Sequence, residues 1–321
     1  MIEARELTKR YGQTLAVDQL SFDVRPGQVT GFLGPNGSGK STTMRMIMGL
    51  DAPEGGRVKV NGRPYAELPW PLREVGALLD AKAFHPGRSA ANHLVALAQT
   101  NGIPRSRVDE VLDLVGMAKV ARRRAGTFSM GMGQRLGIAA ALLGDPGILL
   151  FDEPVNGLDP DGILWVRNLL KSLAADGRTV FVSSHLMSEM ALTADHVVVI
   201  GQGRLIAEAP IADFVARSSK HFVRVRSPEG ARLSWALAAA GATIDTEDDG
   251  ALAVHGLAEA DIGELAARQQ LVLHELSPQA ASLEEAFMEL TADALEYEGK
   301  ERGGASNGSE TDAGRLVPAG K

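Results

Sequence analysis

The hydrophobic pattern changes period several times along the chain. Three segments, 28–34 (QVTGFLG), 148–154 (ILLFDEP) and 179–185 (TVFVSSH), are nearly continuous apolar runs, which is typical of strands buried on both faces of a sheet. The last two are separated by ILWVRNLLKSLAADG, which has helical spacing. Strands that alternate with helices predict an α/β fold with a parallel sheet.

The remaining segments of the first two thirds extend this prediction. Residues 2–24 indicate two or three strands, 40–48 a helix closed by Gly49, 57–62 another strand, 86–143 a helical region and 196–210 a hairpin. The inward-facing candidates of the first strands are Leu15, Val17, Leu20, Phe22 and Val24.

The pattern changes again near Ser218. The segment HFVRVR places Val223 and Val225 on one strand face and two arginines on the other, and LAVHG and LVLHEL are further strand candidates. SLEEAFMEL predicts a helix with a Ser282–Glu285 capping box and an apolar stripe of Leu283, Phe287 and Leu290. We therefore expect a first domain over 1–217, a small α+β domain over 218–290 and a disordered, Gly- and Ser-rich tail over 291–321.

Composition and charge narrow the classes of function. The chain has 321 residues, a net charge of −7 and no cysteine. The acidic balance argues against nucleic acid as a partner, and the absence of cysteine excludes disulfides, thiol catalysis and thiolate zinc sites. The start lacks a secretion signal, and the most apolar stretch is broken by Asp145 and Pro146. We expect a soluble chain that reaches a membrane only through a partner.

The glycines after the first apolar strand predict a phosphate-binding loop. GPNGSGKS fits the pattern G-x-x-x-x-G-K-[ST], for which about one chance match is expected in a hundred chains of this length. Lys40 can reach the β- and γ-phosphates of a nucleoside triphosphate, and the hydroxyl of Ser41 can bind Mg²⁺. The predicted binding residues are Gly34, Pro35, Asn36, Gly37, Ser38, Gly39, Lys40, Ser41 and Thr42.

Two acids end the second apolar strand. Asp152 is the metal candidate, because a buried strand beside a phosphate loop delivers a carboxylate to Mg²⁺ at its C-terminal edge. Glu153 is placed to orient or deprotonate the attacking water, and His185, at the end of the next strand, to contact the γ-phosphate. The alternative is that the acids and the histidine simply end strands at the surface.

The stretch FSMGMGQR (128–135) resembles the signature motif of the ATP-binding-cassette (ABC) family, usually written LSGGQ and followed by QR. Ser129 and Gly131 match the motif, whereas Phe128, Met130 and Met132 depart from it. Further matches follow in the family's order: Tyr11 where an aromatic ring stacks on adenine, NGLD ending at Asp159 as the D-loop, and His185 as the switch histidine. The resemblance covers residues 1 to about 215 and implies an α/β P-loop ABC ATPase core with antiparallel β and α-helical subdomains, the latter at about 83–143.

The resemblance also implies a mechanism and partners. Two cassettes, either two copies or this chain with a homologue, would pair head to tail, so that Ser129 and Gly131 of one copy close over the ATP held by the other. A separate transmembrane permease would dock near 81–89 and the helices up to Arg124, which places the chain at the cytoplasmic face of the cell membrane. Residues 77–94 (ALLDAKAFHPGRSAANHL), with the extra C-terminal domain, resemble the ATPases of ABC-2-type drug and antibiotic exporters, the bacitracin- and daunorubicin-like group.

Several alternatives stay open at this stage. Asp80 stands where the family has a glutamine that contacts Mg²⁺ and water, so it is either a metal ligand or a loop acid. The run 122–124 (RRR) favours a solvated helical face over a phosphate or lipid site. Residues 218–290 suit a regulatory or ligand-binding module and dimer packing equally. A soluble ABC ATPase acting on ribosomes or DNA, or an unrelated P-loop kinase or GTPase, are the rival functions.

Overall fold

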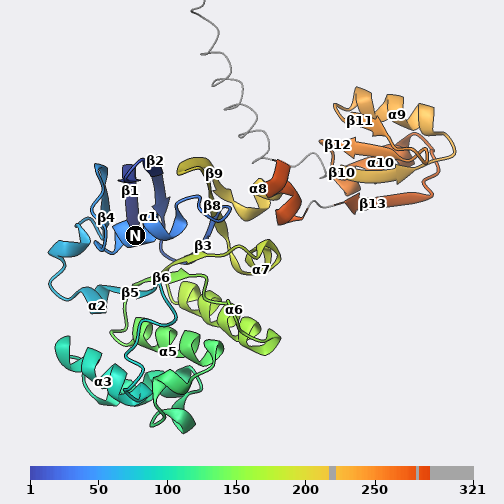
Figure 1. The fold of residues 1–321 in the computed structure, drawn as a ribbon. Coiled ribbons are helices and arrows are strands. Elements are labelled where there is room, and N and C mark those ends of the chain that lie inside the picture. Colours follow the sequence, from blue (N-terminus) through green and yellow to red (C-terminus); the bar gives the residue numbers. More distant parts are fainter. Residues whose placement is uncertain (217–221, 280–281, 290–321) are drawn as a thin grey trace, which may run out of the picture.

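The computed structural model describes residues 1–216, 222–279 and 282–289, and it confirms the expected α/β fold (Figure 1). A six-stranded sheet with the order β5-β6-β7-β3-β8-β9 forms its centre. All neighbouring pairs are parallel except the last, where β9 returns antiparallel to β8. The strands are β3 (Gln28–Leu33), β5 (Val75–Leu78), β6 (Ile148–Asp152), β7 (Thr179–Ser183), β8 (His196–Gly201) and β9 (Arg204–Pro210).

Alternate residues of these apolar strands supply two separate cores. Phe32 and Phe181 belong to one cluster, where their rings lie 4.9 Å apart, and Val29 and Val180 belong to the other. The first cluster is closed by a three-stranded antiparallel sheet with the order β2-β1-β4. Its strands are β1 (Ile2–Tyr11), β2 (Thr14–Val24) and β4 (Gly55–Val60), and four of the five expected inward residues of β2 are fully buried, whereas Leu15 is half-buried.

Helices cover the other core and form the predicted helical region. The largest helix of that region, α5 (Met130–Leu142), packs so closely that a Cβ atom on Gly76 of β5 would lie 1.9 Å from the carbonyl oxygen of Ala141. The helices of the cassette are α1 (Lys40–Ile47), α2 (Pro71–Glu74), α3 (Ala90–Thr100), α4 (Ser106–Leu114), α5, α6 (Pro160–Ala175), α7 (Met187–Thr193) and α8 (Ile211–Ala216), with short 3-10 turns at Tyr65–Glu67, Ala118–Val120 and Ala125–Thr127. None of the helices in the described ranges is long and apolar enough to cross a bilayer.

The C-terminal part contains a third sheet, which is four-stranded and antiparallel with the order β11-β12-β10-β13. Its elements are β10 (Phe222–Arg226), α9 (Gly230–Ala239), β11 (Thr243–Thr246), β12 (Leu252–His255), α10 (Glu259–Arg268) and β13 (Glu275–Gln279). Val223 and Val225 face a core shared with both helices, as the alternation indicated.

The strand expected in LVLHEL was misplaced. The N–H of Leu271 still bonds the carbonyl of Ala266 at the end of α10, at 2.9 Å, and pairing with β10 begins only at Glu275. Leu271 is buried in the local core instead of entering the sheet. The short strand β11 was not expected from the sequence, because only one of its four side chains, Ile244, is partly buried.

The predicted capping box forms before the helical residues 283–289. The hydroxyl of Ser282 accepts the N–H of Glu285 at 3.1 Å, and the carboxylate of Glu285 accepts the N–H of Ser282 at 3.0 Å. The sequence placed this helix in the small domain, but its buried side chains, Leu283, Ala286 and Phe287, belong to the core cluster of the cassette. Figure 1 shows it as the red helix beside α8. Leu290 and the expected tail lie outside the described residues.

Candidate nucleotide-binding site

The phosphate loop curls back on itself between β3 and α1. Gly39 precedes α1 with φ +103°, and a Cβ atom there would lie 2.4 Å from the carbonyl oxygen of Ala16, so only glycine fits. The Lys40 ammonium donates to the carbonyl oxygens of Gly34, at 2.6 Å, and Pro35, at 3.2 Å. Burial lowers the pKa of Lys40, and the negative charges of Glu153 and Asp152 act in the opposite direction. Because no side chain caps α1, the N–H groups of its first turn remain available for an anion.

Asp152 lies opposite this loop at the end of β6. One carboxylate oxygen accepts a hydrogen bond from the Ser41 hydroxyl at 2.7 Å, and the other accepts from the Ser183 hydroxyl at 2.5 Å. Ser183 also accepts the N–H of Glu153 at 3.0 Å. Ser183 was not predicted from the sequence, although a hydroxyl residue in an apolar strand was a usable signal; its register opposite Asp152 follows from the pairing of β6 and β7. The hydroxyl of Ser41 and the carboxylate of Asp152 are the hard oxygen donors that suit Mg²⁺.

Glu153 is held by contacts from two other elements. His185 Nδ1 lies 2.7 Å from Glu153 Oε2, and the main-chain N–H of His185 points to the same oxygen at 3.3 Å. The side-chain amide of Gln134, in α5, donates to the carbonyl oxygens of Glu153, at 3.1 Å, and of Asn156, at 3.4 Å. Glu153 itself has φ +51°, a strained conformation for a residue other than glycine. Gln134 therefore holds the main chain of Glu153, and His185 holds its carboxylate.

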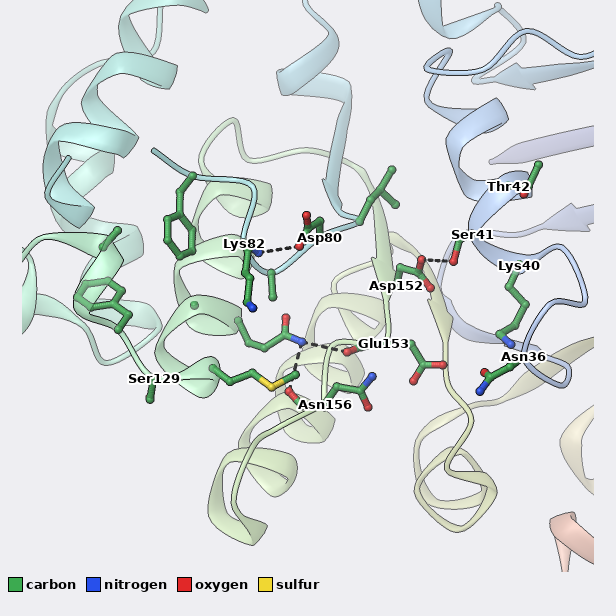
Figure 2. A pocket seen from close by; sticks show the side chains of 18 of the residues that line it. Asn36, Lys40, Ser41, Thr42, Asp80, Lys82, Ser129, Asp152, Glu153 and Asn156 are labelled. Carbon is green, nitrogen blue, oxygen red and sulfur yellow. Dashed lines mark hydrogen bonds between the residues drawn. The ribbon is translucent and has the colours of Figure 1, made fainter. Parts of the chain in front are cut away.

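The phosphate loop, Asp152 and Glu153 line one cavity of about 1070 Å³. Figure 2 shows Lys40 and Ser41 on one side, Ser129 on the opposite side, and Asp152 and Glu153 between them. The predicted residues that line it are Asn36, Gly37, Gly39, Lys40, Ser41, Thr42, Asp80, Ser129, Asp152 and Glu153. The other predicted residues lie outside its lining: Tyr11, Gly34, Pro35, Ser38, Gly131, Asp159 and His185.

Tyr11 lies at the end of β1 with its ring 48% exposed. Its hydroxyl donates to Asp51 at 2.7 Å, and Asp51 is ion-paired with Arg45 of α1, also at 2.7 Å. The Arg45 guanidinium, followed by the Tyr11 hydroxyl, holds the pKa of Asp51 at about 2. The Asp51 carboxylate thus fixes the hydroxyl end of the ring, and the Lys9 ammonium lies over the ring, 5.5 Å from its centre.

Ser129 and Asp159 both begin helices. Ser129 is the N-cap of α5 and accepts the N–H of Met132 at 3.3 Å. Asp159 is the N-cap of α6 and accepts the N–H of Gly162 at 2.9 Å, so it has a structural role in this chain. Met130 stands where the signature has glycine, and it is 54% exposed. It packs against Gly157, because a Cβ atom on Gly157 would lie 2.4 Å from the Met130 sulfur.

Comparisons with known proteins agree with this geometry. Residues 17–156 match a family model described as ABC transporter, and residues 221–284 match a domain of unknown function, DUF8746. The bacitracin transport ATP-binding protein BcrA of Bacillus licheniformis is 41% identical over 69% of this chain and 73% of its own length. The uncharacterized ABC transporter ATP-binding protein YhcH of Bacillus subtilis is 35% identical over 92% of this chain and 97% of its own.

The solved structures that resemble the chain include the ATP-binding cassette MJ0796 as a dimer in a post-hydrolysis state bound to ADP and Pi. It is 25% identical, with a TM-score of 0.60, and the match covers 65% of this chain and 98% of the cassette. These relatives confirm the resemblance that the sequence motifs indicated. The chain belongs to the ABC transporter family and is an ATP-binding subunit with ATPase activity.

Proposed function

We propose that this subunit drives the export of a peptide antibiotic or a similar drug through a separate permease at the cytoplasmic face of the membrane. The observation that carries the proposal is the likeness to transport proteins for such compounds. Besides the bacitracin transport protein, the lantibiotic transport ATP-binding protein SrtF of Streptococcus pyogenes is 34% identical over 65% of this chain and 90% of its own length.

In the proposed mechanism, ATP occupies the cavity with its phosphates on the loop 34–42 and its adenine on Tyr11. Ser41 and Asp152, 2.7 Å apart, would hold Mg²⁺ together with Asp80; the ion supplies charge neutralisation at the phosphates. Glu153 orients the attacking water and accepts its proton. His185, which contacts Glu153 at 2.7 Å, holds that carboxylate and reaches the γ-phosphate.

The proposed complex has two cassettes that face each other head to tail. Ser129 lies across the cavity from Lys40 and Ser41 within one chain (Figure 2). In the proposed dimer its hydroxyl and the N–H of Gly131 would contact the ATP of the partner. ATP would then join the two copies through its γ-phosphate, and hydrolysis would release them. A permease that docks beside the loop 81–89 would convert this cycle into transport.

Purification of the tagged chain from detergent-solubilised membranes of its host tests the transport proposal. We expect a polytopic membrane protein at a near-equal ratio, and expect cells with the intact pair to tolerate more bacitracin or lantibiotic than cells carrying Glu153→Gln. Recovery of ribosomes or DNA in place of a membrane protein would support the soluble ABC ATPase instead.

A further inference from the structure

The loop that follows β5 carries an acid and a base two positions apart. Asp80 and Lys82 both line the nucleotide cavity. One carboxylate oxygen of Asp80 accepts the main-chain N–H of Lys82 at 2.8 Å. The loop is also seated closely on the first turns of α5, because a Cβ atom on Gly133 would lie 3.0 Å from the carbonyl oxygen of Ala81. Figure 2 shows the Lys82 side chain extending into the cavity from this loop.

The Lys82 ammonium differs from the other charged groups of the cavity. Lys40 bonds two carbonyl oxygens, Asp152 accepts from two hydroxyls, and Glu153 accepts from His185. Within the described parts of the chain, Lys82 has no hydrogen-bond or ion-pair partner for its ammonium group. It is a donor placed at the cavity whose acceptor the fold does not supply.

The charge of the cavity calls for such a donor. Without Lys82, the lining has three carboxylates, Asp80, Asp152 and Glu153, against one ammonium. An ATP γ-phosphate brought into this space would meet one more negative charge than it would with a neutral residue at position 80. Lys82 restores the balance from the same loop.

We propose that Lys82 contacts the terminal phosphate of ATP, and that Asp80 and Lys82 act as one charge-compensated pair that distinguishes ATP from ADP. This inference rests on the proposed placement of the phosphates in the cavity. A nucleotide without the third phosphate lacks the group that Lys82 reaches, so it gains nothing from the ammonium.

Equilibrium titration with AMP-PNP and with ADP, each with Mg²⁺, tests the pair without relying on turnover. We expect Lys82→Ala to weaken AMP-PNP binding about tenfold, the scale of one charge-assisted hydrogen bond, and to change ADP binding less than about twofold. Lys82→Arg should retain most of the affinity. The double variant Asp80→Asn, Lys82→Ala should recover part of the loss for AMP-PNP relative to ADP, because it removes the uncompensated carboxylate as well, whereas the loss of an Mg²⁺ ligand at position 80 affects both nucleotides alike.

Lys171→Ala, an exposed lysine of α6 away from the cavity, is the matched control and should bind both nucleotides as the unmodified chain does. Equal losses for AMP-PNP and ADP, or no loss for either, would overturn the role of Lys82 while leaving the ATP site intact. If the unmodified chain bound neither nucleotide, the proposed mechanism would fall together with this inference.

Discussion

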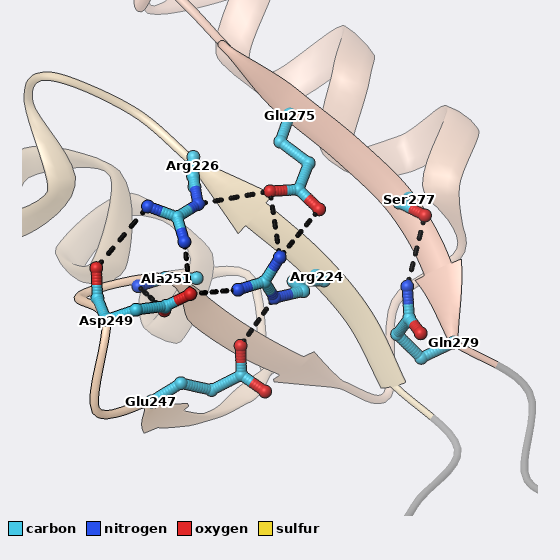
Figure 3. Close-up of polar contacts among 8 residues, drawn as sticks. All are labelled: Arg224, Arg226, Glu247, Asp249, Ala251, Glu275, Ser277 and Gln279. Carbon is cyan, nitrogen blue, oxygen red and sulfur yellow. Dashed lines mark hydrogen bonds and ion pairs between the residues drawn. The ribbon is translucent and has the colours of Figure 1, made fainter.

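The molecule contains two clusters of charged residues. They differ in whether the fold supplies partners for all of their charged groups. In the C-terminal sheet, Arg224 contacts Glu247, Asp249 and Glu275, and Arg226 contacts Asp249 and Glu275 (Figure 3). Each guanidinium there is paired by the fold. In the cassette, the cavity leaves the first N–H groups of α1 and the Lys82 ammonium without such partners among the residues that the structure describes. A cluster that satisfies its own charges stabilises structure, whereas one that leaves donors open is built to bind a ligand.

Glu153→Gln should have the largest effect on the activity of the nucleotide site. Because the amide cannot accept a proton from water, we expect ATP hydrolysis to fall about 100- to 1000-fold, while ATP binding persists and the ATP-bound dimer accumulates. Phosphate release and gel filtration with ATP and Mg²⁺ measure both effects. Glu264→Gln, which removes an exposed acid paired with Arg268, is the control. A monomer throughout would contradict the head-to-tail dimer.

Gly39→Ala should disable the phosphate loop through the backbone alone. A methyl group at φ +103° and 2.4 Å from the Ala16 carbonyl forces the loop to move. Left-handed strain of about 1–3 kcal/mol for a non-glycine residue corresponds to about 5- to 150-fold weaker ATP binding. Titration with ATP measures it. Gly147→Ala, where no atom lies within 4 Å, should bind ATP normally; equal behaviour of the two variants would refute the steric explanation.

Arg224→Ala should affect the other cluster and spare the cavity. The change removes the cation that Glu247, Asp249 and Glu275 share, and leaves Arg226 to pair with Asp249 and Glu275 only. We expect the melting temperature of this part to fall by a few degrees, with no change in ATP binding. Thermal unfolding and nucleotide titration on the same sample separate the two effects. A loss of ATP affinity would show that the clusters are coupled.

The smallest expected effect is on the pH dependence of stability, through His93 in the helical region. Burial, followed by the nearby charge of Arg88, lowers the pKa of His93 below 6.5 in the folded chain. Below pH 6.5 the unfolded chain then binds more protons than the folded chain. The contribution of His93 to the free energy of unfolding is therefore complete above pH 6.5 and is lost as the pH falls below that value. We expect His93→Gln to remove part of this decline between pH 7.5 and 5.5, measured by thermal unfolding. His196, whose pKa burial also lowers, supplies a remaining decline in the variant.

Much of the cassette was predictable because its signals are local. The glycine pattern of the phosphate loop follows from backbone conformations that only glycine adopts easily, and the apolar runs of β3, β6 and β7 follow from burial on both faces of the sheet. The capping box at Ser282 and Glu285 is local in the same way, since both partners lie within one turn.

The tertiary structure alone decided how distant segments meet. Gln134 reaches the Glu153 carbonyl across 19 positions, and His185 reaches the Glu153 carboxylate across 32. The packing of Phe287 into the cassette core, and the pairing of Arg224 with acids from two other segments, likewise join parts of the chain far apart in sequence. Sequence periodicity determines which face of an element is buried, but the element that covers it depends on the whole chain. The motifs therefore specified a nucleotide site, and the fold specified which side chains hold its carboxylate in place.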